Sequence, residues 1–187
     1  AVGVYDSYHQ HDEHSRHLGN DFLASLVQDW EEAALAAKVL GTRVCIMRFG
    51  VVYGNGGGAM AKMLPPFSLG MGGKIGDGLQ MISWIHLQDL VRACLFLIEN
   101  QELEGVFNLT SPQPISNLLQ TKKMGEHLHR PTFMSIPSWV VKLIFGEGAC
   151  VMLDSKEVYP RRLEAAGFTF KYPTFDSAME QIVHGRE

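Results

Sequence analysis

Short apolar segments alternate with segments of helical periodicity along most of this chain. Residues 43–49 (RVCIMRF), 81–86 (MISWIH) and 105–110 (GVFNLT) are short and apolar, as buried strands are, and a stretch with apolar residues at helical spacing follows each of them. Strands that alternate with helices form mainly parallel sheets, because each helix carries the chain back along the sheet. The pattern predicts an α/β fold with a parallel sheet.

The first 41 residues predict a strand end, a loop and a helix. Residues 1–5 (AVGVY) have the composition of a buried strand end, and residues 6–20 are polar and aperiodic, as loops are. Asn20 or Asp21 can then cap a helix that Gly41 closes. At helical spacing, one face of this helix should carry Phe22, Leu26, Trp30 and Ala34.

The remaining elements follow from the same signals. Pro65 and Pro66 should bend or end a short helix over 59–69, and residues 70–80 should form a flexible loop or small hairpin. In the helix predicted over 87–100, the inward residues should be Leu90, Cys94, Leu97 and Ile98. Further helices are expected over 116–129, 137–145, 160–166 and 174–184.

Composition excludes several classes of protein. Of the 187 residues, 46% are hydrophobic and 19% are charged, which is ordinary for a globular protein and wrong for a disordered one. A net charge of -4 without a basic stripe argues against a nucleic-acid partner, and no apolar run is long enough to predict a membrane span. The cysteines are far apart in apolar stretches, so reduced thiols in a cytoplasmic protein are expected: Cys45, Cys94 and Cys150. Because the first residue is not Met, the chain is expected to be processed or excerpted.

One glycine-rich stretch imitates a dinucleotide-binding loop. Residues 54–59 (GNGGGA) fit the pattern G-x-G-x-x-G/A and follow a predicted strand, and Asp77 lies near the distance at which an acidic residue is expected. We reject this interpretation because Pro65 and Pro66 should cut the following helix short, and because residues 70–76 do not have the composition of a buried strand. The stretch is instead interpreted as a loop that bends sharply over a cleft.

Three motifs together resemble those of a known family. Residues 48–54 (RFGVVYG) are similar to the R-x-G-x-V-Y-G segment of extended short-chain dehydrogenases/reductases, and residues 84–90 (WIHLQDL) to their F/W-I-H-x-x-D-L segment. Residues 107–110 (FNLT) resemble the strand end that follows in that family, and the order and spacing agree. The nucleoside-diphosphate-sugar-epimerase-like subfamily is indicated by Trp30–Glu31, by residues 56–67 and by residues 160–168.

This resemblance implies a particular architecture. The chain should be the C-terminal part of a doubly wound, parallel-sheet (Rossmann-like) domain that carries a small, mostly helical substrate lobe. Residues 1–52 and 84–110 would belong to the dinucleotide-binding domain, and residues 53–83 and 111–187 to the substrate-binding lobe. The pyrophosphate-binding loop of the family has no counterpart in this chain.

The resemblance also shows what this chain lacks. In the family, a catalytic Ser or Thr precedes the A-V-G-x-Y segment, a position that falls just before Ala1. A Tyr-x-x-x-Lys pair should open the first helix, where this sequence has Phe22 and Leu26 instead. Because Phe and Leu can neither transfer a proton nor lower the pKa of a neighbour, the usual route of hydride transfer is not expected, and no catalytic residue is assigned.

The matching positions suggest where ligands would bind. In the parent fold, Gly50, Val51 and Val52 would line the nicotinamide end of the cofactor groove, although a buried strand exit explains them equally well. Arg48 could bind a substrate phosphate or could pair with Asp89 instead. His86 could contact a ligand or bond to neighbouring backbone, with Asp89 capping the helix that starts near Leu90. As candidate substrate contacts we take Arg48, Met63, Trp84, His86 and Arg161, each with a structural alternative.

Four histidines near the N-terminus raise the question of a metal. His9, His11, His14 and His17 lie in the predicted loop, but their spacing is loose and no cysteine is near. Because zinc sites need four ligands in a set geometry, we expect a mobile, partly charged loop and no metal.

The function implied by the resemblance is an NADP- or NAD-dependent oxidoreductase of the nucleotide-sugar-epimerase kind, with an unknown substrate. The alternative is a non-catalytic NAD(P)-binding regulatory or interaction protein, which the missing Tyr and Lys favour. The expected partners are a small molecule such as a nucleotide sugar and a second copy in a homodimer, with no nucleic acid and no membrane. The isolated chain should not bind dinucleotide tightly, because the pyrophosphate loop is absent.

Overall fold

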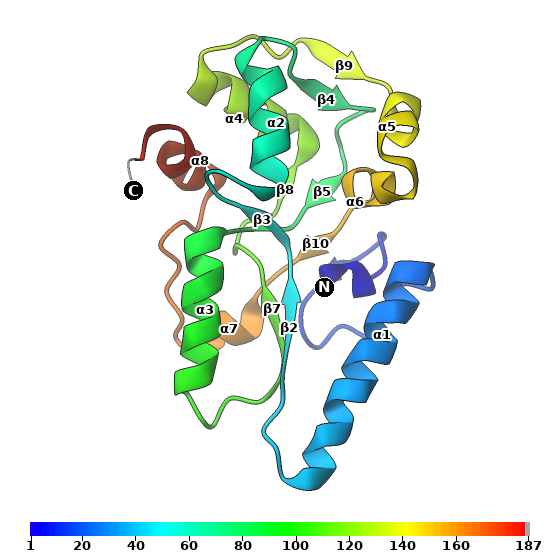
Figure 1. Ribbon diagram of the computed structural model, residues 1–187, viewed down its shortest axis with the longest axis vertical. Helices are drawn as coiled ribbons and strands as arrows, with labels where there is room; N and C mark the ends of the chain where they lie inside the picture. The colour runs from blue at the N-terminus through cyan, green and yellow to red at the C-terminus, as the bar shows by residue number, and fades with distance from the viewer. Residues whose placement is uncertain (186–187) are drawn as a thin grey trace.

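The computed structural model describes residues 1–185, apart from the side chains at positions 144, 145, 147, 148, 150 and 151 (Figure 1). At its centre, strands β2 (Cys45–Phe49) and β7 (Gly105–Leu109) are parallel, with Cys45 opposite Gly105 and Phe49 opposite Leu109. The chain continues from β2 into β3 (Val51–Tyr53), which pairs in parallel with β6 (Trp84–His86). The fold is therefore a Rossmann-like α/β arrangement with parallel strands, as expected.

Gly50 is the residue at which the chain exchanges one strand partner for another. Its N–H donates to the carbonyl of Leu109 at 3.2 Å, whereas the next N–H, that of Val51, donates to Ser83 at 2.8 Å. A Cβ at position 50 would lie 2.7 Å from the Ser83 carbonyl oxygen, closer than real contacts allow. Glycine is needed here because the backbone of a neighbouring strand comes too close for any side chain.

Helices lie on both sides of these strands. Figure 1 shows α1 (Phe22–Leu35) on one side and α3 (Leu87–Glu99) with the short α7 (Arg161–Ala165) on the other. The turn η1 (Val2–Val4) packs on α1, and the 3₁₀ turn η2 (Ala36–Leu40) extends α1 as far as Gly41. Asp21 caps α1 through the Ala24 N–H, and Gly41 ends the helical segment with a φ of 75°, as predicted.

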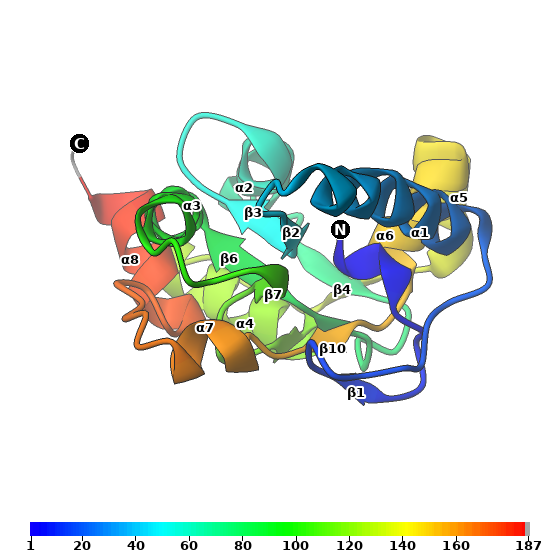
Figure 2. The same ribbon diagram turned by 90° about the horizontal axis from the view of Figure 1, so that it is seen from below.

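The lobe lies beyond the carboxyl ends of β2 and β3 (Figures 1 and 2). Two of its helices, α4 and α8, pack against each other, and its short strands form the pairs β4–β9 and β5–β8, while β10 pairs with β1. The helices are α2 (Gly58–Ser68), α4 (Asn117–Leu128), α5 (Ser138–Phe145), α6 (Cys150–Leu153) and α8 (Phe175–His184), with the 3₁₀ turn η3 (Gly146–Ala149). The strands of the lobe are β4 (Gly73–Ile75), β5 (Met81–Ile82), β8 (Ile115–Ser116), β9 (Met134–Ile136) and β10 (Glu157–Val158), and β1 (Gln10–His11) belongs to the N-terminal segment.

The apolar residues that share one face of α1 are not the residues that the helix buries. Ala24 and Val27 are buried against η1, whereas Phe22 is 78% exposed and Trp30 is 64% exposed. A similar difference occurs in α3, where Ala93 is buried in place of the expected Ile98, which is exposed. Helical spacing selects residues that share a face but does not say which side the rest of the fold covers.

Two further local predictions were wrong, those for residues 1–5 and 70–80, whereas the helix predicted over 59–69 is present. Residues 2–4 form a 3₁₀ turn, because the N–H groups of Val4 and Tyr5 bond to carbonyls three residues earlier. Helix α2 covers nearly the predicted range and ends at Ser68, so Pro65 and Pro66 lie in its last turn, where their carbonyls accept from Leu69 and Met71. The expected loop over 70–80 contains β4, which pairs in parallel with a strand about 60 residues away along the chain.

Among the described residues the buried apolar side chains form four clusters, of which two are the largest. One lies between the lobe and β3–β6 and includes Tyr53, Trp84 and Met179; the other lies between α3, β7 and α7. Among the described residues, no helix combines the length and the apolar character that crossing a bilayer requires. Cys45 and Cys94 are free thiols and are half-buried.

Candidate functional site

The predicted cofactor segment lies where β2 passes into β3. The N–H groups of Gly50 and Val51 already donate to Leu109 and Ser83, and Val52 lies opposite Ile85 in the parallel pair. The two N–H groups therefore close the sheet and are not free to bind a carboxamide. The position itself, at the carboxyl end of a parallel strand, is where ligands bind in open α/β sheets.

Arg48 lies at the centre of a buried polar network. Its guanidinium donates to both carboxylate oxygens of Glu31, at 2.8 and 2.6 Å, and to the hydroxyl of Tyr5 at 2.7 Å. That hydroxyl donates in turn toward the side-chain oxygen of Asn108 at 2.9 Å. The side chain thus fastens α1 and the N-terminal segment to β2, and the partner is Glu31, not the Asp89 that we considered from the sequence.

Burial and pairing shift the pKa values in this network. Burial raises the pKa of Tyr5, and the adjacent Arg48 guanidinium opposes that shift. Burial alone would lower the pKa of Arg48, but hydrogen bonds to Glu31 and Tyr5 raise it overall. Both groups therefore keep their protons at neutral pH, and the network consists of one cation, one carboxylate and a neutral phenol.

Sequence reasoning assigned no role to three members of this network. Tyr5, Glu31 and Asn108 all lie within segments that carry the family resemblance, and that position was the signal that could have identified them. The residues that hydrogen-bond to one another in this network are 17 to 103 positions apart along the chain, so local spacing could not reveal the pairing.

Trp84 and Met63 belong to the core of the lobe. Trp84 is fully buried, stacks on Tyr53 at 5.9 Å between ring centroids, and donates its indole N–H to the Gln113 carbonyl at 3.0 Å. Met63 is half-buried against the same cluster, with its sulfur 3.9 Å from the Gln120 side-chain nitrogen. In this geometry both side chains fill the interior between β6 and the lobe helices.

His86 and Asp89 exchange the structural roles expected of them. The N-cap of α3 is His86, whose Nδ1 accepts from the Gln88 N–H at 3.2 Å while its Nε2 bonds to Gln181 of α8 at 2.9 Å. Asp89 does not cap the helix: its buried carboxylate accepts the N–H groups of Lys171 and Tyr172 at 2.8 and 2.7 Å. Both residues fasten the C-terminal segment to the start of α3.

The environment of His86 predicts a pH dependence of stability. Burial lowers the pKa of His86, while Gln181 and Asp89 partly oppose this and Lys171 adds to it. A lowered pKa favours the neutral ring in the folded state, so this stabilisation is present above about pH 6.5, the unfolded value, and is lost as the pH falls through the folded pKa. We expect the difference in urea midpoint between the native chain and His86→Gln to shrink from pH 7.5 to pH 5.5. A difference that is constant across this range would contradict the assignment.

Arg161 is exposed and lies apart from the other candidates. It pairs with Glu164 at 3.2 Å and covers the ring of Tyr159. Its neighbour Arg162 instead donates to the carbonyls of Glu104 and Val106, where β7 begins. None of the polar contacts found for Arg161 within residues 1–185 reaches Met63, Trp84 or His86.

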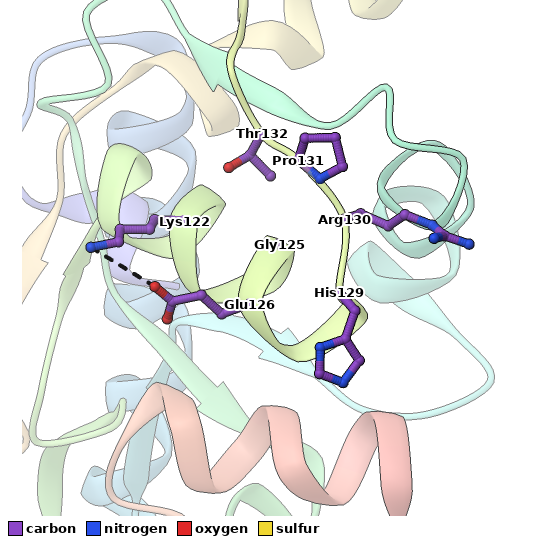
Figure 3. Close-up of a pocket in the computed structure, with 7 residues that line it drawn as sticks. All are labelled: Lys122, Gly125, Glu126, His129, Arg130, Pro131 and Thr132. Carbon is purple, nitrogen blue, oxygen red and sulfur yellow. Dashed lines mark ion pairs between the residues drawn. The ribbon is translucent and has the colours of Figure 1, made fainter.

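Two open hollows are found on the lobe among the residues that the structure describes. One, of about 480 Å³, lies at the end of α4, where Figure 3 shows Lys122, Glu126, His129 and Arg130 around its rim. The other, of about 510 Å³, lies beside β4 and β5 and includes Asp77, Gln80, Ser138 and Lys142 in its lining. Neither contains any of the residues predicted to bind cofactor or substrate.

An apolar surface borders the free edge of β2. Within residues 1–185, the only strand hydrogen-bonded to β2 is β7, and Met47 and Phe49 on β2 are partly exposed. On α1, Phe22 and Trp30 are exposed as well. We refer to Met47 and Phe49 on the unpaired edge of β2 as the β2-edge surface. An unpaired strand with exposed apolar side chains is a surface that proteins normally cover.

Comparison with known protein families gives two matches. Residues 22–110 match the NAD dependent epimerase/dehydratase family. Residues 136–182 match a domain of unknown function, DUF1731. The first match contains α1, the β2–β3 and β6–β7 strands and α3, and the second covers most of the C-terminal segment.

Individual relatives agree with these matches. The epimerase family protein SAR0825 of Staphylococcus aureus is 40% identical over 185 residues, which are 98% of this chain and 62% of the relative. A crystal structure of human epimerase family protein SDR39U1 (isoform 2) with NADPH has a TM-score of 0.90 and 36% identity, covering 98% of this chain and 63% of that one. The nucleoside-diphosphate sugar epimerase from Corynebacterium glutamicum has a TM-score of 0.79 and 30% identity, covering 98% of this chain and 36% of that one.

Residues 22–110 therefore resemble the NAD dependent epimerase/dehydratase family, and nearly the whole chain is similar in sequence and fold to epimerase family proteins. It spans about 62% of the length of the curated relatives that it matches. At the positions where the Tyr-x-x-x-Lys pair would open α1, it has the exposed Phe22 and the half-buried Leu26.

Proposed function

We propose that this chain works as the part of an NADP(H)- or NAD(H)-binding oxidoreductase that lies next to the nicotinamide and the substrate. The observation that carries the proposal is the match to human SDR39U1, whose crystal structure was determined with NADPH and which shares the fold over 98% of this chain. Gly50, Val51 and Val52, at the carboxyl end of β2, are the residues that we propose to line the cofactor groove.

We propose that the substrate is a small polar molecule of the nucleotide-sugar class, which would bind between the sheet and the lobe. Residues 1–52 and 84–110 would form the cofactor side, and residues 53–83 and 111–187 the substrate side. The buried contacts of Arg48, Trp84 and His86 favour roles in positioning the walls of the cleft, and Met63 and Arg161 remain candidates for substrate contact. The spaced, free thiols of Cys45 and Cys94 support a cytoplasmic protein.

The β2-edge surface supports an arrangement in which further strands pair with β2. In relatives longer than this chain, such strands could come from the part that it does not match. We propose in addition a homodimer through α1, for which the exposed Phe22 and Trp30 supply apolar surface.

A second candidate function is a non-catalytic NAD(P)-binding regulatory protein. It is favoured by Phe22 and Leu26, which occupy the positions of the family's Tyr and Lys and cannot transfer a proton. The two candidates share cofactor binding and differ only in turnover.

The proposal is tested by titrating NADPH, and separately NADH, into the complete protein and into this chain alone, with nicotinamide fluorescence as the readout. We expect saturable binding by the complete protein only, because backbone N–H groups of a glycine-rich loop supply most of the affinity for the pyrophosphate. Absence of binding by the complete protein would refute the proposal. Tight binding by this chain alone would point to residues 54–59 as the phosphate loop. Oxidation of bound NADPH by nucleotide sugars would then separate the enzyme from the non-catalytic protein.

A further inference from the structure

Two packed helices of the lobe place charged side chains in facing rows. On α8, Asp176, Glu180 and His184 follow one another at intervals of four residues, so they share one side of the helix. On α4, Lys123 and His127 do the same. The opposite side of α8 packs into the core through Phe175, Ala178, Met179 and Ile182. This packing fixes the two rows relative to each other (Figure 1).

Three of these side chains bring metal-binding atoms together. The ligand atoms of His127, Glu180 and His184, which we call the α4–α8 cluster, all lie within 4.8 Å of one another. His127 Nδ1 is 3.8 Å from a carboxylate oxygen of Glu180. Around a tetrahedral zinc ion with bonds of about 2.0–2.1 Å, ligand atoms lie roughly 3.3 Å apart, so changes in side-chain rotamer alone would close the site.

The other nitrogen of His127 already has the partner that a metal-binding histidine needs. Its Nε2 lies 3.4 Å from the carboxylate of Asp176, which is itself held by an ion pair with Lys123. A carboxylate on the far side of the ring fixes the tautomer and the orientation of the imidazole, and it makes the ligating nitrogen more basic. Because His127 is largely buried while Glu180 is exposed, a metal ion can reach the cluster from solvent.

We propose that the α4–α8 cluster binds a divalent transition metal of the zinc class, with His127, Glu180 and His184 as ligands and water completing the coordination. Two imidazoles and one carboxylate are ligands that suit Zn²⁺. Asp176 is a positioning residue that orients His127. The ion clamps the C-terminal helix onto α4, and Gln181 on the same helix extends this clamp to His86.

A second group of potential ligands serves as the internal comparison. Asp6, His9 and His17, which we call the loop cluster, also lie within 4.8 Å of one another. His9 already bonds to Asp6 at 2.8 Å, and the His9 and His17 rings stack at 4.2 Å with an angle of 17° between them. In the loop cluster, Asp6 and His9 precede β1 and His17 lies in the loop between β1 and α1. The α4–α8 cluster is instead built on two helices, which hold ligands with greater precision.

The proposal is tested by titrating Zn²⁺ into chelator-treated chain in competition with a chromophoric chelator. We expect each chain to bind one Zn²⁺ ion tightly. Addition of Zn²⁺ should also raise the midpoint of thermal unfolding, because a ligand that binds only the folded state stabilises it. Asp176→Asn should weaken binding about tenfold, as changes to groups that orient ligands do. Glu180→Gln and His184→Ala should weaken it more, and the double variant His9→Ala/His17→Ala should leave it unchanged.

Two outcomes would overturn the proposal. The first is tight binding that survives Glu180→Gln and His184→Ala but is lost in His9→Ala/His17→Ala, which would assign the ion to the loop cluster. The second is weak binding of several equivalents in all variants, which would indicate only nonspecific contacts with surface histidines. Thermal unfolding in the presence of chelator checks that each variant folds, and Co²⁺ substitution reports tetrahedral coordination from its visible absorption.

Discussion

Arg48→Met is expected to lower the free energy of unfolding by about 3–5 kcal/mol. The substitution leaves the Glu31 carboxylate, whose side chain is only 14% exposed, without its bidentate partner, and it removes a donor to the buried Tyr5 hydroxyl. Breaking a buried ion pair on one side is costly because the remaining charge has lost its hydration without compensation. Urea unfolding at neutral pH measures the effect.

The double variant Arg48→Met/Glu31→Leu separates the cost of an orphaned charge from the cost of lost packing. Because both charges are gone, we expect it to recover part of the stability that the single variant loses. The matched control is Arg161→Met at the exposed Arg161–Glu164 pair, which should change stability by no more than about 0.5 kcal/mol. A loss of under about 1 kcal/mol in Arg48→Met would show that the network does not hold the N-terminal segment in place.

Trp84→Ala is expected to have an equally large effect, about 3–5 kcal/mol, because it empties the centre of the lobe core. The indole is fully buried between Tyr53 and Phe175, with ring centroids 5.9 and 5.6 Å away, and its N–H donates to the Gln113 carbonyl. Removing it leaves both a cavity and an unpaired carbonyl. Thermal or urea unfolding followed by circular dichroism measures the change.

Trp30→Ala provides the matched control, since the same side chain is removed from the exposed face of α1. We expect a change within about 0.5 kcal/mol. Trp84→Phe keeps most of the packing and should fall between the two, so a result is available even if Trp84→Ala does not fold. If Trp84→Ala is as stable as the native chain, Trp84 is not a core residue and its proposed contact with substrate regains weight.

The sequence by itself determined the order and type of most elements. Local signals were sufficient for the strands over 43–49 and 105–110, for the Asp21 cap and for the end of the first helical segment at Gly41. These features depend on residues within a turn or two of each other, so periodicity and capping chemistry reveal them. The resemblance to a known family rested on short stretches of sequence of the same kind. The strand predicted over 81–86 is in fact two short strands, β5 and β6, which pair with different partners.

Only the tertiary structure decided which residues meet. It placed Glu31 on Arg48, gave Asp89 the N–H groups of Lys171 and Tyr172, and brought His127 to Glu180 and His184. It also buried Ala24 and Val27 instead of Phe22 and Trp30, because the face that a helix buries depends on what packs beside it. These contacts join segments that are tens of residues apart, and their partners are selected by the packing of the whole chain, which no local pattern encodes.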